Sequence, residues 1–163
     1  MAVIDSSALI PLIKIGRLDL LAKVFDKILI PTPVWEEVAI EGKKLGKPVK
    51  EFVDGKGKWF SIYETKHKVN FDKSIEKNDY LVFLAAKDSN DILVTNDATL
   101  YYYALSQNVK CHWLTTLILL AAKSKTISKS DAQNILLELV NSAGLHLSSE
   151  ILSELLIIIK SIL

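Results

Sequence analysis

The first ten residues, MAVIDSSALI, constrain the fold of this chain more than any other stretch. Ala2–Ile4 is a run of apolar residues typical of a short buried strand, and Asp5 follows it directly. Leu9, Leu12 and Ile13 then recur at helical spacing, which predicts a helix capped by Ser6 or Ser7. The opening therefore predicts a strand that delivers one carboxylate to the edge of a sheet, where a helix begins.

The same alternation of strand and helix continues along the chain. Further strands are predicted at Lys27–Ile30, Trp59–Tyr63, Asp91–Thr95 and Val109–Trp113. Further helices are predicted at Arg17–Phe25, Pro33–Ile40 (capped by Thr32), Ile75–Lys87 (capped by Ser74), 98–105, Thr115–Ser124, Ser130–Ser142 and Ser148–Leu163. Asp91–Thr95 lacks polar alternation, which is typical of a parallel strand covered on both faces. The pattern predicts right-handed β-α-β units around an open parallel sheet.

Composition narrows the class of protein. The 163 residues suit one domain with a substantial core, and the net charge of +1 selects no partner. The single cysteine excludes a disulfide framework and indicates a reducing cytoplasm. We see no basic leader followed by a long apolar run, and Ile151–Leu163 is too short to span a membrane. Because Arg17 is the only arginine, lysines must supply most of the positive charge.

Four acidic residues occupy positions that suggest a common site. Asp5 and Asp97 follow predicted strands, whereas Glu37 and Asp79 stand near the starts of predicted helices. Converging carboxylates repel one another, and a divalent cation would compensate that repulsion. Hard oxygen ligands without a cysteine or histidine cluster favour Mg²⁺ or Mn²⁺ over zinc. Such a site supports hydrolysis of phosphodiester bonds.

Each acid also has a purely structural interpretation. Asp5 and Asp97 could be N-caps of the helices that follow them. Asp79 could be a first-turn acid favoured by the helix dipole, and Glu37 could be a solvated helix residue. The metal-site hypothesis rests on the four together. A phosphate-transfer domain is a weaker alternative, because Asp5-Ser6-Ser7 offers neither a second aspartate two residues on nor a glycine loop.

Several motifs of the chain resemble those of PIN domains. VIDSSALIPLIKIGRLDLL is similar to the start of such proteins, and PTPVWEE to a PxxVxxE segment that selects Glu37. NDYLVFLAA places Asp79 before an apolar helix, and VTND places Asp97 in a T-x-D pattern. The C-terminal segment from Leu119 to about Leu155 also resembles the helical extension of one PIN group.

The resemblance implies a three-layer α/β/α sandwich and a Mg²⁺- or Mn²⁺-dependent endoribonuclease acting on single-stranded RNA. It implies one domain over 1–163, with an α/β core at 1–125 and a helical extension at 126–163. Asp5, Glu37, Asp79 and Asp97 would be the metal ligands and catalytic residues, with Ser7 and Thr95 supporting them. Many PIN proteins are homodimers and toxins inhibited by an antitoxin protein, so we expect such partners in the cytoplasm.

The chain also departs from the family pattern. Ala98-Thr99-Leu100-Tyr101 follows Asp97 without the usual basic residue, which leaves a PIN-like scaffold that no longer cleaves as the alternative function. Lys43–Lys58 contains six lysines and two acids, and we favour a solvated loop there over an RNA contact. Tyr101–Tyr103 could offer stacking surfaces, although at least one should be in the core. The last helix is apolar on most faces, which predicts a second subunit or partner against it.

Overall fold

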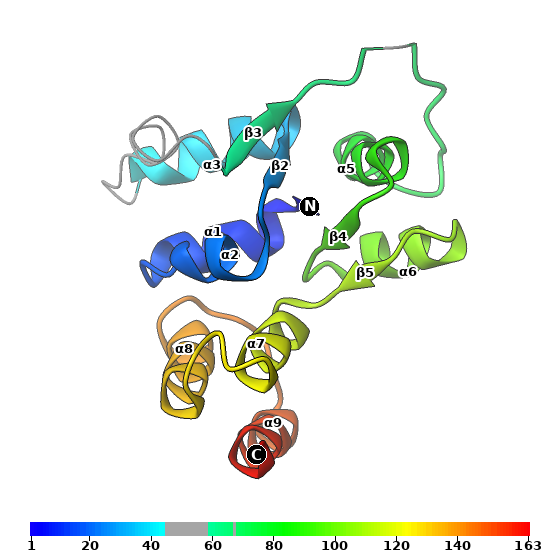
Figure 1. The fold of residues 1–163 in the computed structure, drawn as a ribbon. Coiled ribbons are helices and arrows are strands. Elements are labelled where there is room, and N and C mark those ends of the chain that lie inside the picture. The colour runs from blue at the N-terminus through cyan, green and yellow to red at the C-terminus, as the bar shows by residue number, and fades with distance from the viewer. Residues whose placement is uncertain (45–58, 67) are drawn as a thin grey trace.

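A computed structural model describes residues 1–44, 59–66 and 68–163 of the chain. Its centre is one sheet of parallel strands: β1 (Ala2–Ile4), β2 (Ile28–Pro31), β3 (Phe60–Tyr63), β4 (Ile92–Val94) and β5 (Cys111–His112). The strand order is β3-β2-β1-β4-β5. Figure 1 shows β2 and β3 on one side of the N-terminus and β4 and β5 on the other. The predicted central parallel sheet is confirmed, and each of its strands lies within one residue of a predicted one or inside it.

The strand order reverses at β1. The chain builds outward from β1 through β2 to β3, and then returns to the other side of β1 for β4 and β5. In this register Ile4 pairs with Val94, so the residues that follow β1 and β4 leave the sheet side by side. Open parallel sheets bind ligands beyond the carboxyl ends of the strands at such a switch point. The topology therefore brings Asp5 next to the segment that begins at Thr95.

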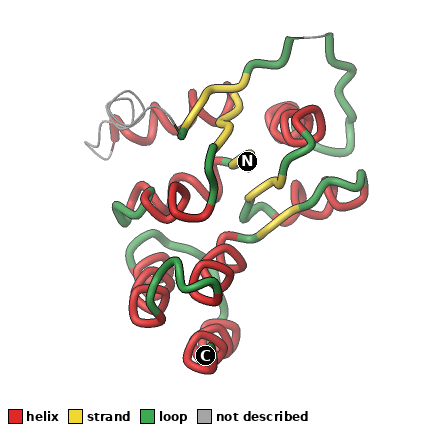
Figure 2. The backbone as a smooth tube through the Cα atoms, in the orientation of Figure 1, coloured by secondary structure: helices red, strands yellow, loops and turns green. Residues whose placement is uncertain are grey.

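Helices cover both faces of the sheet, which confirms the three-layer α/β/α architecture (Figures 1 and 2). α5 (Lys77–Ser89) and α6 (Ala98–Ser106) lie on one face, and α1 (Ser6–Lys14) and α2 (Asp19–Val24) on the other. α3 (Thr32–Lys44) follows β2 and packs against α1 and α5. α7 (Leu114–Lys123), α8 (Lys129–Asn141) and α9 (Ser149–Ser161) stack beside α2.

The predicted caps were partly wrong. α1 is capped by Asp5 rather than by Ser6 or Ser7, because the Asp5 carboxylate accepts a hydrogen bond from Ser7 N. α5 begins at Lys77, two residues later than expected. Ser74 does not cap it, because its N–H and hydroxyl both donate to Asp72 Oδ1. Thr32 is the first residue of α3 rather than its cap, and its hydroxyl donates to the Tyr63 carbonyl.

Pro11 lies in the middle of α1. A proline there has no N–H to donate to the carbonyl of Ser7, four residues earlier. The side-chain amide of Asn96 donates to that carbonyl instead, at 3.1 Å. Asn96 thus compensates the missing helical bond and ties the end of β4 to α1.

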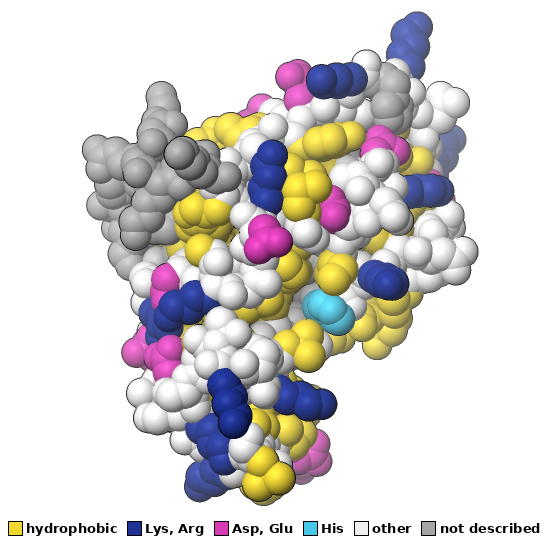
Figure 3. All heavy atoms as spheres, viewed as in Figure 1, with side chains coloured by type: hydrophobic (Ala, Val, Ile, Leu, Met, Phe, Trp, Pro, Cys, Tyr) yellow, Lys and Arg dark blue, Asp and Glu magenta, His cyan; other side chains and the backbone are white. Residues whose placement is uncertain are grey.

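The core is continuous from the sheet into α7 and α8. Four side chains of α8 are buried in the same cluster as the strands: Ala132, Ile135, Leu136 and Leu139. α9 contributes only Ile159 to the buried set, whereas Ile151, Ile157 and Ile158 are exposed. Figure 3 shows hydrophobic and basic side chains together on the surface over this end of the molecule. Within the described ranges, no helix has both the length and the apolar character needed to cross a membrane.

Some sequence expectations fall on residues that the structure does not describe. Most of the lysine-rich stretch Lys43–Lys58, with the short helix expected around Val49–Asp54, lies outside the described residues. Both therefore stay predictions.

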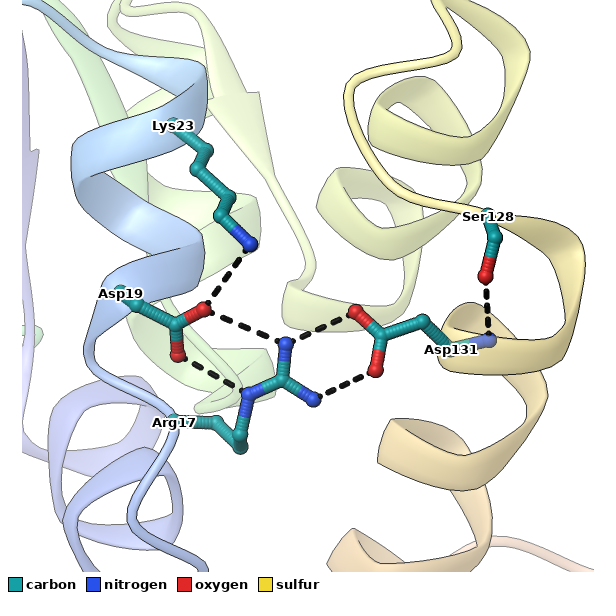
Figure 4. Close-up of polar contacts among 5 residues, drawn as sticks. All are labelled: Arg17, Asp19, Lys23, Ser128 and Asp131. Atoms are coloured by element: carbon teal, nitrogen blue, oxygen red, sulfur yellow. Dashed lines mark hydrogen bonds and ion pairs between the residues drawn. The ribbon is translucent and has the colours of Figure 1, made fainter.

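Arg17 joins the loop before α2 to the first turn of α8 (Figure 4). Its Nη1 and Nη2 each donate to Asp131 at 2.8 Å, and its Nε donates to Asp19 at 2.9 Å. Ser128 caps α8 by accepting from Asp131 N, so this aspartate is fixed from both sides. The Arg17 hydrogen bonds are the main reason why the pKa of Asp131 and that of Asp19 are lowered. The only arginine is therefore a structural residue and is not available for phosphate.

We expect Arg17→Met to lower the free energy of unfolding by about 1 to 2 kcal/mol at pH 7, allowing for partial solvent exposure. A carboxylate with a lowered folded-state pKa contributes stability above its ordinary value of 3.8 and loses it as pH falls through the folded value. The difference from wild type should therefore shrink below about pH 4. Urea unfolding at pH 7 and pH 3 measures this, with Lys27→Met as the matched surface control. A difference that is equal at both pH values would contradict the assigned role of the ion pair.

Candidate active site

A cavity of about 800 Å³ lies at the carboxyl ends of the strands. All four predicted acids line it: Asp5 after β1, Glu37 in α3, Asp79 in α5 and Asp97 after β4. The other lining residues are Ser6, Ser7, Ile10, Pro11, Lys73, Ser74, Ile75, Glu76, Asn78 and Thr99. Four segments that are far apart in the sequence thus bring their carboxylates to one hollow in the surface.

Asp5 is held firmly through one of its two oxygens. Its Oδ2 accepts from the hydroxyls of Ser7 and Thr95, the latter at 2.9 Å, and from Ser7 N. The side chain is only 5% exposed, and Thr95 is fully buried. Among the described residues no hydrogen bond reaches Asp5 Oδ1. The carboxylate is therefore fixed in position and keeps one oxygen for a ligand.

The two hydroxyls also connect Asp5 to the backbone after β4. Each hydroxyl gives its single proton to Asp5, so it can only accept from its other neighbours. Ser7 Oγ accepts from Asn96 N at 2.9 Å, and Thr95 Oγ1 accepts from Asp97 N at 3.0 Å. This short chain of hydrogen bonds sets the spacing between Asp5 and Asp97. Ser7 and Thr95, the two residues expected to support the acids, thus both donate a hydrogen bond to Asp5.

Asp97 has two functions in the geometry of the site. Its Oδ1 accepts from Leu100 N at 2.8 Å and caps α6, as the structural interpretation of this residue predicted. The same side chain is half-buried and lines the cavity. Capping uses one carboxylate oxygen, so capping and ligand binding are compatible for both Asp5 and Asp97.

Asp79 shows the electrostatic cost of this arrangement most clearly. It is half-buried in the first turn of α5, and its pKa is raised from 3.8 to about 6. Burial is the largest cause, followed by the negative charges of Asp5, Asp97, Glu76 and Glu37. The three other predicted acids are therefore close enough to Asp79 to disfavour its ionisation. Glu37 lines the same cavity but is exposed at its rim.

The residues of the cavity fit a divalent cation by their chemistry. Carboxylate oxygens from four elements converge, one of them carries a raised pKa, and Mg²⁺ and Mn²⁺ prefer such hard oxygen donors. Within the described part of the chain, no three acidic, histidine or cysteine side chains stand as a preformed metal cage.

Sequence reasoning missed the positive charge of the site. Lys73 lines the cavity from the loop before α5, although the sequence after Asp97 lacks the expected basic residue. Asp72 fixes this loop by accepting from Ser74 N, from Ser74 Oγ and from the Tyr103 hydroxyl. Lys73 lies just before the predicted helix Ile75–Lys87, but only the fold shows that its side chain lines the acidic cavity.

The three tyrosines after Asp97 do not line the cavity. Tyr103 packs edge-on against Phe83, and Tyr101 stacks on Trp113 with ring centroids 4.0 Å apart. Tyr102 is 64% exposed on the outer side of α6. None of the three rings is therefore placed to stack on a ligand inside this cavity.

Comparison with known proteins agrees with this geometry. A family model described as a PIN domain matches residues 1–161, so the chain belongs to the PIN domain family. No curated protein matches the chain significantly. PIN domains are generally nucleases, a class of hydrolases that cleave nucleic acids.

Two solved structures match the chain at low sequence identity. One is a PilT N-terminus domain protein from the hyperthermophilic archaeon Sulfolobus solfataricus P2, with 18% identity and a TM-score of 0.56 over 78% of this chain and 93% of that one. The other is a domain of a functionally unknown protein from Methanocaldococcus jannaschii, with 18% identity and a TM-score of 0.45 over 69% and 89%. At this identity the first structure supports the PIN-like fold alone.

Proposed function

We propose that this protein is a metal-dependent endoribonuclease that hydrolyses phosphodiester bonds of single-stranded RNA. The observation that carries the proposal is the convergence of Asp5, Glu37, Asp79 and Asp97 on one cavity at the switch point of a PIN-like sheet. Mg²⁺ or Mn²⁺ bound there would polarise the phosphoryl oxygen and activate water. The four carboxylates would hold the ion.

The residues around the acids have separate tasks in this proposal. Ser7 and Thr95 orient Asp5 through its Oδ2, so the oxygen offered to the ion is Oδ1. Lys73 is the positively charged residue of the cavity that can attract a phosphate, in place of the basic residue missing after Asp97. Asp79 lines the cavity beside the other acids, so its carboxylate is our candidate acceptor for the proton of the attacking water.

The test of this function is cleavage of a fluorescently labelled single-stranded RNA. We expect cleavage with Mg²⁺ or Mn²⁺, none with EDTA, and much slower cleavage of the same strand in a duplex. A catalytically inactive PIN-like scaffold is the alternative, and it would bind RNA without cleaving it. Intact RNA after prolonged incubation with Mn²⁺ would contradict the nuclease proposal and favour the scaffold.

We place this activity in the cytoplasm, as the toxin of a toxin–antitoxin pair. The support is membership of the PIN family together with the exposed isoleucines of α9, which suit a protein partner. A homodimer and an antitoxin protein are the two partners that we propose. A neighbouring short gene for a DNA-binding protein whose product inhibits cleavage would support the toxin role.

A further inference from the structure

A second cavity of about 430 Å³ adjoins the acidic one. Asn78 lines both cavities from the first turn of α5. The loop before α5 also contributes to both, because Phe71 lines the second cavity and Lys73 lines the first. A polymer that reaches the carboxylates can therefore extend directly into the second cavity.

The loop that separates the cavities is well fixed. Asp72 ties it to α6 by accepting from the Tyr103 hydroxyl at 2.9 Å, and fixes a turn within the loop by accepting from Ser74 N at 2.9 Å and Ser74 Oγ at 2.7 Å. The Phe71 ring stands edge-on to Tyr80, with centroids 5.8 Å apart, and Lys77 Nζ lies 5.0 Å from its centre. Phe71 is nevertheless 39% exposed, which leaves ring surface for a ligand.

The lining of the second cavity suits a flat, uncharged group. Phe71 and Tyr63 provide aromatic surface, and Val69 and Leu81 provide apolar walls. Glu36, Glu64 and Lys77 also line it. The two carboxylates can accept hydrogen bonds from the amino groups of a base, and the lysine can donate to its ring nitrogens or carbonyl oxygens. The volume is within the range of cavities that hold small organic ligands.

The two cavities together match the alternation of charge along single-stranded RNA. The acidic cavity, with Lys73, takes the phosphate, and the aromatic cavity takes the neighbouring base. Single-strand binding proteins commonly combine a basic path for the backbone with aromatic side chains on which bases stack. Here the fixed loop presents both kinds of group within three residues of one another, Phe71 and Lys73.

We propose that the second cavity is a base-binding subsite, in which Phe71 stacks on the base of the nucleotide next to the cleaved phosphodiester bond while Lys73 contacts the phosphate. The inference rests on the proposed function, because it takes single-stranded RNA as the ligand. The subsite adds a second contact with the substrate, made through a base and not through a phosphate.

The subsite can be tested in the Asp5→Asn variant, which should bind RNA without cleaving it. Fluorescence anisotropy with a short labelled oligoribonucleotide gives the dissociation constant. Adding Phe71→Ala should weaken binding roughly 5- to 100-fold, and Phe71→Trp should restore it. Tyr102→Ala removes an exposed aromatic ring outside both cavities and should change nothing. Circular dichroism establishes that each variant is folded.

An abasic nucleotide placed at each position in turn makes the test independent of any general effect on structure. At one position the abasic substitution should weaken binding to the Phe71-containing protein about as much as Phe71→Ala does. The two losses should not add, because both remove the same stacking contact. Additive losses at every position, a Phe71→Ala effect below about twofold, or no RNA binding by the Asp5→Asn parent would each overturn the subsite.

The subsite and the proposed function fail in different ways. Cleavage by wild type together with unchanged binding and KM in Phe71→Ala would refute the subsite and leave the nuclease intact. Non-additive losses in a protein whose wild type never cleaves would support the base site and refute the nuclease.

Discussion

Asp5→Asn should reduce metal-dependent RNA cleavage by about 10²- to 10³-fold or more while the protein stays folded. The asparagine carbonyl can still accept from Ser7 N, Ser7 Oγ and Thr95 Oγ1, so the cap of α1 and its links to β4 are retained. What is lost is the negative charge and the second carboxylate oxygen. The rate of cleavage under single-turnover conditions with saturating Mn²⁺ measures the effect.

Asp26→Asn is the matched control for this change. Asp26 is an exposed aspartate outside the cavity, so its replacement removes the same charge without touching the site. Its cleavage rate should equal that of wild type. Cleavage by Asp5→Asn at the wild-type rate would mean that Asp5 only caps α1.

Asp79→Asn should stabilise the metal-free protein at pH 7.5 by about 1 to 2 kcal/mol, allowing for solvent screening. The pKa of Asp79 is about 6 in the folded state against an ordinary 3.8. Between these pH values the native state therefore keeps a proton on Asp79 that the unfolded state has released. Stability therefore falls as pH rises through this window, and the full cost of ionisation is present above pH 6. Asparagine carries no charge and avoids that cost.

The gain from Asp79→Asn should consequently disappear near pH 4, where the wild-type side chain is already neutral. Denaturant unfolding in EDTA at pH 4 and pH 7.5 measures both values, with Asp26→Asn again as the control. With Mn²⁺ at pH 7.5, wild type should become more stable than Asp79→Asn, because the ion stabilises the wild-type carboxylate and has one ligand fewer in the variant. A variant less stable than wild type at pH 7.5 without metal would show that Asp79 is not under repulsion.

The sequence predicted the elements well because their signals are local. The apolar runs of β1 and β4 and the acids that follow them can be read within a few residues, and so can the helix starts near Glu37 and Asp79. What local signals cannot give is the reversal of strand order at β1, which makes Asp5 and Asp97 neighbours. The convergence of the four acids on one cavity was therefore a hypothesis until the fold was known.

Apart from the helix caps, the features that the sequence does not reveal involve contacts between distant segments. Pro11 is tolerated within α1 because Asn96, 85 positions away in the chain, bonds to Ser7 O. Arg17 is bound to Asp131 and not to a phosphate. Lys73 and Phe71 lie in a polar connection that has no periodicity, so nothing in the sequence indicates that they face the two cavities. Polar and charged contacts between residues far apart in the sequence leave no local pattern from which they could be predicted.

The central claim is that the four carboxylates form one metal site, and titration calorimetry with Mn²⁺ tests it most directly. Wild type should bind Mn²⁺ at or below millimolar concentration. Asp97→Asn, which keeps the cap of α6 through its carbonyl oxygen, should bind at least about tenfold more weakly. No binding by wild type at millimolar Mn²⁺, or equal binding by the two proteins, would contradict the claim.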